Sequence, residues 1–239
     1  MRVLGVDGCP GGWVGALVDT AAPAGVRWLA LADPAAVLAA GAAHGVAATG
    51  IDMPIGLPDG PEPRAADAAA RTRLGPRRSS VFPTPARAVL AATSYEQACA
   101  LSARAAERRL SVQAWNIVDR IRALDAVLTP DLQRRVVEVH PEVSFAALAG
   151  APLAAPKKVA AGRAAREAAL AGWFAELDIP ATAVTAPRGT PGRSDDRLDA
   201  LACAWSALRW ARGVADVLPC GHLGDPPRDS RGLRCEIVV

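Results

Sequence analysis

Four aspartates stand where their carboxylates could meet. Asp7 ends an apolar segment that begins at residue 3, and Asp52 ends a second one at residues 46–52. Asp196 and Asp199 lie near the start of a helical stretch, three positions apart, so they share one face of that helix. Open α/β sheets bind ligands at the carboxyl ends of their strands. Converging carboxylates there would suit Mg²⁺ or Mn²⁺, and two such ions can promote phosphodiester cleavage.

A plainer role is open to each of these side chains. An aspartate after a strand often caps a turn, and Asp195 or Asp196 could cap the helix that follows. Capping needs one aspartate, however, whereas residues 195–199 contain three. Like charges so close together repel and require a counter-charge, which a divalent cation supplies. The set therefore favours a metal site, with candidate catalytic and metal-binding residues Asp7, Asp52, Asp196 and Asp199.

Two glutamates flank a histidine further along the chain. Glu138 and Glu142 lie on either side of His140 and Pro141. One of the three ionisable side chains could join the metal ligands or act on the proton of a water, and Glu142 is a candidate catalytic residue. Alternatively, Glu142 stabilises the first turn of a helix behind Pro141, and His140 has a structural role.

A basic segment follows Asp52. Residues 64–87 contain six arginines and one acid, a local charge of 6 − 1 = +5, against +3 for the whole chain. Guanidinium groups bind phosphate through paired hydrogen bonds, and glycine-rich turns expose backbone N–H groups. A solvated basic face is the commoner meaning of such a run, but its place after Asp52 favours phosphate. The candidate phosphate- and substrate-binding residues are Arg64, Arg71, Arg77, Arg78, Ser79, Ser80, Arg87 and Lys157.

The predicted elements bring these residues together. Apolar runs predict strands at residues 2–7, 13–19, 26–32, 46–52 and 135–140, and a small strand at 235–239. Helices are predicted at residues 33–44, 62–74, 112–128, 141–148, 160–177 and 195–212, and one begins at Ser94. The fourth strand follows a helix and is expected to be parallel to the first. This order is the ribonuclease H topology: an α/β fold with an RNase H-like mixed sheet, forming a single domain at 1–239 with a helical insertion at about 54–134.

The composition excludes several classes of protein. The chain has 239 residues, of which 51% are hydrophobic, so a disordered chain is excluded. A net charge of +3 is too small to indicate nucleic-acid binding by itself. The five cysteines form no CxxC pair and predict neither a disulfide framework nor a zinc site. No apolar stretch approaches the ~20 residues of a membrane span, and a cytoplasmic protein is expected.

Several motifs resemble those of a known family. Residues 6–14 (VDGCPGGWV), 51–57 (IDMPIGL) and 138–145 (EVHPEVSF) resemble the signatures of domain-of-unknown-function family 429, described as predicted nucleases with an RNase H fold. The spacing of Arg64, Asp67, Arg71, Gly75, Arg77, Ser79, Ser80 and Phe82 does so too. Residues 196–202 (DRLDALA) are similar to the acidic C-terminal helix of RuvC-type resolvases, which implies metal ligation by Asp196 and Asp199. Those enzymes usually have glutamate where this chain has Asp52.

The expected function is that of a metal-dependent nuclease or phosphodiesterase that uses Mg²⁺ or Mn²⁺ in an acidic two-metal site. One alternative is an ATP-using phosphotransferase of the actin-like, sugar-kinase superfamily, although residues 136–145 offer no second phosphate loop. Another is a non-catalytic nucleic-acid-binding protein of the same fold. The expected partner is nucleic acid or another phosphate-containing substrate, with no membrane, and a homodimer is left open.

Overall fold

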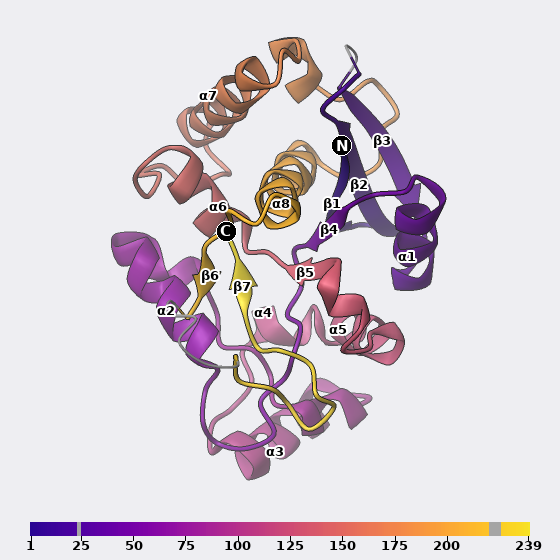
Figure 1. Cartoon of the computed structure of the whole chain (residues 1–239). Coiled ribbons are helices and arrows are strands. Elements are labelled where there is room, and N and C mark those ends of the chain that lie inside the picture. Colours follow the sequence, from indigo (N-terminus) through magenta and orange to yellow (C-terminus); the bar gives the residue numbers. More distant parts are fainter. Residues whose placement is uncertain (23–24, 220–225) are drawn as a thin grey trace.

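A five-stranded mixed sheet forms the centre of the protein (Figure 1). The structure, a computed structural model, describes residues 1–22, 25–219 and 226–239. The strands are β1 (Arg2–Cys9), β2 (Gly12–Asp19), β3 (Val26–Leu31), β4 (Ala48–Ile51) and β5 (Val136–Glu138), in the order β3-β2-β1-β4-β5. The first three form an antiparallel meander, and β4 and β5 continue the sheet in parallel with β1. The predicted meander and the parallel β1–β4 pair are confirmed.

The two faces of the sheet are covered by different helices. Successive strand residues point to opposite faces, and the core is divided accordingly. Val3, Val14 and Ala48 pack with α8 (Ser194–Ala211), whereas Leu4 and Ile51 pack on the opposite side. That opposite side is covered by α1 (Pro34–Ala43) and α5 (Val118–Val127). Beyond α8 lie α6 (Pro141–Leu148) and α7 (Ala160–Glu176), and a short 3-10 turn, η4 (Ala181–Val184), packs against α7.

The chain between β4 and β5 is helical, as predicted. It contains α2 (Ala65–Leu74), η1 (Gly75–Ser80), η2 (Arg87–Ala91), α3 (Tyr95–Ala106), α4 (Val112–Trp115), α5 and η3 (Leu132–Arg134). Several of its apolar residues, including Val89, Leu110 and Val118, form a small core of their own. The helix predicted at 112–128 is broken into α4 and α5 at Asn116 and Ile117. Asparagine competes with the helix by bonding to nearby backbone groups, which makes a break there inexpensive.

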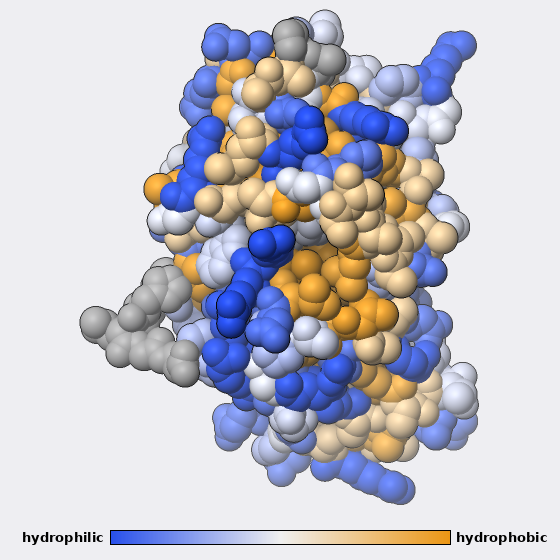
Figure 2. Space-filling view, turned by 45° about the vertical axis from the view of Figure 1, so that its right-hand side comes forward, coloured by the Kyte–Doolittle hydropathy of each residue, from blue (hydrophilic) through white to orange (hydrophobic). Residues whose placement is uncertain are grey.

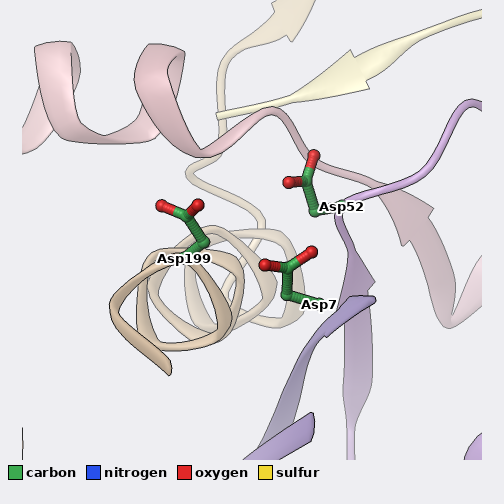
Figure 3. Close-up of side chains that lie close together, drawn as sticks. All are labelled: Asp7, Asp52 and Asp199. Carbon is green, nitrogen blue, oxygen red and sulfur yellow. The ribbon is translucent and has the colours of Figure 1, made fainter. Parts of the chain in front are cut away.

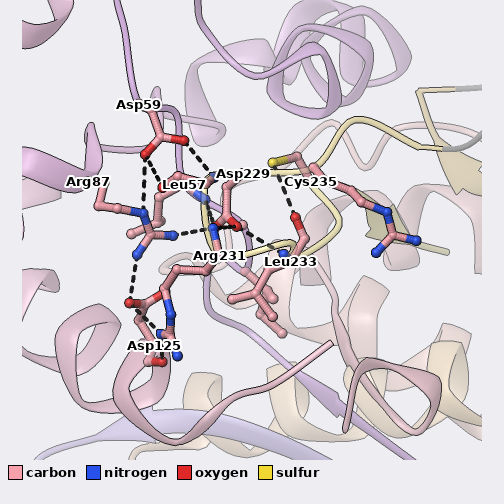
Figure 4. Close-up of polar contacts among 12 residues, drawn as sticks. Leu57, Asp59, Arg87, Asp125, Asp229, Arg231, Leu233 and Cys235 are labelled. Carbon is pink, nitrogen blue, oxygen red and sulfur yellow. Dashed lines mark hydrogen bonds and ion pairs between the residues drawn. The ribbon is translucent and has the colours of Figure 1, made fainter. Parts of the chain in front are cut away.

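The C-terminal segment at residues 226–239 runs between the sheet and the inserted helices (Figure 1). Its strand β7 (Ile237–Val238) pairs with β6 (Val217–Leu218) and forms a bridge to Val139 beyond β5. The fully buried carboxylate of Asp229 accepts hydrogen bonds from the backbone N–H groups of Leu57 and Leu233 and pairs with Arg87 (Figure 4). This segment therefore connects the loop after β4 to the rest of the molecule.

The surface carries both polar and apolar regions. Figure 2 shows hydrophobic side chains gathered in the middle of one face, with hydrophilic side chains below them and to their left. Within the described ranges, no helix is both long and apolar enough to cross a membrane. The four described cysteines, Cys9, Cys99, Cys203 and Cys235, are buried free thiols, and Cys220 lies outside the described residues.

Candidate functional site

Two neighbouring strands direct Asp7 and Asp52 to the same side of the sheet. In the β1–β4 ladder, Gly5 is paired with Gly50, and each aspartate follows its glycine by two positions. Side chains two positions apart lie on one face of a strand, so both carboxylates lie on the face that α8 covers. A Cβ atom on Gly5 would lie 1.9 Å from the carbonyl oxygen of Ala200, and one on Gly50 would lie 2.5 Å from that of Cys203. The two glycines thus allow α8 to approach the strands closely.

This close approach brings Asp199 to the two strand-end carboxylates. Asp199 immediately precedes Ala200 on α8 and is 1% exposed. One carboxylate oxygen from each of Asp7, Asp52 and Asp199 lies within 4.8 Å of the other two. Figure 3 shows the three side chains, called the triad below, pointing toward one another from β1, from the end of β4 and from α8. The geometry agrees with the predicted convergence of these three residues.

Burial and nearby negative charges raise the pKa of every triad carboxyl. Desolvation is the main cause for Asp7, whose pKa is raised well above its ordinary value, and the charges of Asp52 and Asp199 add to it. Desolvation also raises the pKa of Asp52 to about 6 and that of Asp199 to about 7, although the charge of Lys157 lowers both. Three carboxylates that resist ionisation together are the arrangement that a divalent cation stabilises.

Lys157 supplies one positive charge to the triad. Its Nζ lies 2.5 Å from Oδ2 of Asp199. Burial lowers the pKa of Lys157, but the charge and hydrogen bond of Asp199, together with the charges of Asp52 and Asp7, raise it above its ordinary value, so the ammonium remains charged. Oδ1 of Asp199 is buried and has no hydrogen-bond donor among the described residues. A buried carboxylate oxygen without a partner is costly, and together with the all-oxygen donor set it fits a hard cation such as Mg²⁺ or Mn²⁺.

Asp196 makes a different contact from the three triad aspartates. It is not part of the triad group, and its Oδ2 accepts a hydrogen bond from the backbone N–H of Arg193 at 2.8 Å. As the third residue of α8, Asp196 reaches back to cap the start of that helix. Helix capping, the plainer of the two interpretations, therefore describes its contact, although its charge still raises the pKa of Asp7 and Asp52.

A cavity of about 570 Å³ opens at the triad. Its lining includes the cationic side chains of Arg77, Arg120 and Lys158. Its remaining lining includes Ser79, Ser80, Phe82, Gln113, His140, Glu142 and Lys157. We call this space the triad cavity. It brings part of the predicted basic segment to the carboxylates, as the order of the chain after Asp52 suggested.

Glu142 lines the triad cavity but is already paired. Its Oε1 lies 2.6 Å from Nη2 of Arg166, and its Oε2 lies 3.8 Å from Nη2 of Arg77. Arg166 is fully buried, donates to the carbonyl of Gly162 at 2.7 Å and lies over the ring of Phe145. The negative charge of Glu142 raises the pKa of Asp52 and Asp199. Glu142 thus acts electrostatically on the triad from a position fixed by Arg166.

Arg64, expected to bind phosphate, lies in a buried ion cluster. Its guanidinium donates to both oxygens of Glu138 at 2.6 and 2.7 Å and to Oδ1 of Asp67 at 2.7 Å. It also donates to the carbonyl groups of Ile55 and Gly56. Burial raises the pKa of Glu138, but the charge of Arg64 opposes that rise. Because its donors are engaged by nearby acids and carbonyl groups, Arg64 holds the loop after β4 in place.

The other predicted basic residues divide into two groups. Arg77, Ser79, Ser80 and Lys157 line the triad cavity. Arg71 instead donates to the carbonyl of Val81 at 2.7 Å, and Arg78 is exposed and does not line the cavity. Arg87 pairs with Asp59, Asp125 and Asp229. The structure therefore brings only part of the basic segment to the site and uses the remainder to hold loops.

Two arginines near the site were missed in the sequence. Arg120 lines the triad cavity, and its Nη2 donates to the carbonyl of Cys9 at 2.8 Å. Arg120 precedes Ile121 on the polar side of α5, and nothing in the local sequence distinguishes it from an ordinary solvent-exposed arginine. Arg166 lies within the alanine-rich helix α7, where the sequence likewise gives no sign of its burial.

His140 lines the triad cavity as well. Its buried ring nitrogen Nδ1 has no partner among the described residues, and burial lowers the pKa of this histidine.

Comparison with known families agrees with the sequence motifs. Residues 5–222 match the family described as Protein of unknown function (DUF429). The chain belongs to this family. Neither the curated proteins nor the solved structures gave a match. The family description states no activity, so a functional conclusion has to rest on the chemistry of the triad and its cavity.

Proposed function

We propose that this DUF429 protein is a metal-dependent phosphodiesterase with an RNase H-like fold that hydrolyses nucleic acid. The observation that carries the proposal is the buried triad, which has an unpartnered Oδ1 on Asp199 and opens into a cavity with cationic walls. Carboxylate oxygens hold Mg²⁺ or Mn²⁺, and cationic walls attract a phosphodiester. The strand order β3-β2-β1-β4-β5 and the C-terminal helix across β1 and β4 support the RNase H-like assignment.

The residues around the cavity have distinct parts in this proposal. Asp7, Asp52 and Asp199 would hold the cation, which would supply a water of lowered pKa and a positive charge for the leaving oxygen. Lys157 neutralises one triad charge and orients Asp199. Arg77, Arg120 and Lys158 line the same cavity and bind the phosphate oxygens of the substrate. Lys157 is held by Asp199 and Arg120 by the carbonyl of Cys9, which pre-organises this part of the site.

Replacing Asp7 tests the proposal directly. We expect the wild-type protein to cleave some member of a panel of single- and double-stranded DNA and RNA with Mg²⁺ or Mn²⁺, and not in chelator. Asp7→Asn keeps the shape of the side chain but removes its charge. Cleavage should then fall by a factor on the order of 10²–10³, as when one pre-organised electrostatic group is lost. Asp131→Asn, at a side chain that is 89% exposed, is the matched control and should retain activity.

Two results would contradict the proposal. Unchanged cleavage by Asp7→Asn would remove the triad from the reaction. Mn²⁺ binding without cleavage of any nucleic acid would instead favour a binding protein of this fold. A calorimetric titration with Mg-ATP separates the phosphotransferase alternative, because only that function requires tight binding of the nucleotide.

A further inference from the structure

A second hollow lies next to the triad cavity. Its volume is about 390 Å³, and it shares Lys157, Lys158 and Asp199 with the triad cavity. Its other walls come from the starts of α7 and α8, where Arg163, Arg193 and Asp195 contribute side chains. Because two of the shared residues are adjacent lysines, a ligand that crosses them would reach from one space into the other. We call this space the second hollow.

The charges of the second hollow leave several cations available. Lys157 is matched by Asp199, and Arg166, which also lines the hollow, is matched by Glu142. Within the described part of the chain, neither Lys158 nor the side chain of Arg193 has an ion-pair partner. Arg163 meets Glu167 only at 4.0 Å, with both side chains about half exposed (51% and 49%). Three exposed cations, Lys158, Arg163 and Arg193, thus face one remaining acid in the lining, Asp195.

The backbone adds positive potential at the same place. α7 has 17 residues and begins after Val159 without a side-chain cap, so its first N–H groups lack side-chain acceptors. Gly162, in the first turn of α7, allows the carbonyl group of Pro156 to approach the helix closely. A Cβ atom on Gly162 would lie 2.0 Å from the carbonyl oxygen of Pro156. That contact holds the Lys157–Lys158 loop over the start of the helix. In addition, Nε of the buried Arg166 has no acceptor among the described residues.

We propose that the second hollow is a phosphate-binding subsite for the phosphate next to the one at the triad. This inference rests on the proposed function and names its substrate as a nucleic-acid strand with at least two consecutive phosphates. Arg163 and Arg193 contact the flanking phosphate, and Lys157 and Lys158, which line both spaces, lie between the two phosphates. A single-stranded end or a locally opened strand can follow this path, because successive phosphates of one strand would occupy adjacent hollows.

Binding measured without metal tests the subsite independently of cleavage. The double variant Arg163→Gln/Arg193→Gln changes two exposed side chains that lie outside the triad cavity. Fluorescence anisotropy of a labelled single-stranded oligonucleotide is followed in chelator over a salt series. Each lost phosphate contact should reduce the slope of log Kd against log salt by about 0.7, so the double variant should lose about 1.4. Arg104→Gln, an exposed arginine on α3, is the control and should leave the slope unchanged.

A kinetic comparison separates failure of the subsite from failure of the proposed function. With Mn²⁺, the double variant should raise KM for the oligonucleotide about tenfold or more, with little change in kcat. Hydrolysis of bis(p-nitrophenyl) phosphate, which has one phosphate, should not change. An unchanged salt slope would overturn the subsite even if cleavage is observed.

Inorganic phosphate gives a further test. The subsite would also be overturned if the double variant lost tight binding of inorganic phosphate but kept its affinity for the oligonucleotide, because the hollow would then be a site for free phosphate. The expected slope without any cleavage would leave the subsite standing and reject the phosphodiesterase.

Discussion

At the scale of single residues, the triad combines burial with like charge. Folding places three carboxyl groups together at the cost of raising the pKa of each, and the charge of Lys157 offsets part of that rise. Such stored electrostatic cost is found at functional sites because the ligand, and not the protein alone, completes the charge balance. The triad is therefore where the stability of the protein should depend most on pH and on metal.

The metal-free protein should lose stability as pH rises. The folded state keeps protons on Asp52 and Asp199, with pKa values of about 6 and about 7, that the unfolded state releases nearer 3.8. Raised pKa values in the folded state mean that stability falls with pH through this window and levels off above it. We expect Tm in chelator to decrease between about pH 4 and pH 7, by about 2–4 °C for each kcal/mol of stability lost.

Asp199→Asn isolates this effect, because it removes the titrating group and keeps its shape. The fall of Tm with pH should become shallower in this variant, while Asp131→Asn should retain the wild-type profile. Excess Mn²⁺ should raise the Tm of the wild-type protein most at the upper end of the range, where the carboxylates are ionised. An equally steep fall in Asp199→Asn would contradict the assignment to this carboxyl.

At the scale of elements, two glycines determine how α8 meets the sheet. Gly5 and Gly50 lie side by side on β1 and β4, and the backbone of α8 occupies the space that their side chains would have filled. Asp199 directly precedes Ala200, whose carbonyl oxygen faces Gly5 in this contact. The triad thus depends on two residues that have no side chain of their own.

Gly5→Ala should disturb both stability and metal binding. The added Cβ would lie 1.9 Å from the carbonyl oxygen of Ala200 and 2.2 Å from the amide nitrogen of Ala204, so α8 has to shift. Overpacking of this kind costs about 1–3 kcal/mol, measurable by urea unfolding. Mn²⁺ affinity, followed by calorimetry, should fall as well, because the shift moves Asp199.

Gly172→Ala provides the matched control. A Cβ on this glycine of α7 meets nothing within 4 Å, and the backbone there is helical. We expect it to stabilise the protein by about 0.4–1 kcal/mol without changing Mn²⁺ affinity. Equal effects of the two substitutions would show that close packing at Gly5 does not position the triad.

Local sequence patterns predicted the strands of the central sheet and the convergence of Asp7, Asp52 and Asp199 at its edge. Alternating and continuous apolar runs are strong signals for buried strands, and strand ends followed directly from them. Asp196 differed because its position in the first turn of α8 lets its carboxylate reach the N-cap amide, and the local sequence serves both roles equally. The repeated Gly-x-Asp pattern at residues 5–7 and 50–52 is the signal that could have indicated the close helix contact.

Charge pairing between distant elements could not be predicted in the same way. Arg71 and Arg77 belong to the same basic segment, but Arg71 donates to the carbonyl of Val81 and does not line the triad cavity, whereas Arg77 does. The difference depends on which element faces each arginine after folding, which composition does not specify. The break between α4 and α5 and the burial of Arg166 depend on tertiary contacts in the same way.

At the scale of the whole molecule, the C-terminal segment joins parts that are distant in sequence. Asp229 accepts hydrogen bonds from Leu57 and Leu233, and its partner Arg87 also pairs with Asp125 of α5 (Figure 4). Ile237 of β7 lines the triad cavity. The segment therefore links the loop after β4, the inserted helices and a wall of the cavity.

Asp229→Ala should loosen this connection. Removing one partner from a buried charged cluster costs about 3–5 kcal/mol of stability. Here it leaves the N–H groups of Leu57 and Leu233 without an acceptor and removes one ion-pair partner of Arg87. Hydrogen exchange followed by mass spectrometry should show faster exchange at residues 54–60 and 226–239 than in the wild-type protein. Asp131→Ala, at an exposed pair, should not change it. Unaltered protection in Asp229→Ala would show that apolar packing alone holds the segment.

The separation of the triad residues along the chain has a consequence for biosynthesis. Asp7 and Asp52 leave the ribosome early, and the β1–β4 ladder can pair long before the ribosome reaches residue 199. Translation proceeds at about 5–20 residues per second, so the two strand-end carboxylates remain uncovered for many seconds. The nascent chain therefore cannot bring the three triad carboxylates together before residue 199 has been made. Under the proposed function, activity begins only when α8 docks on the two glycines.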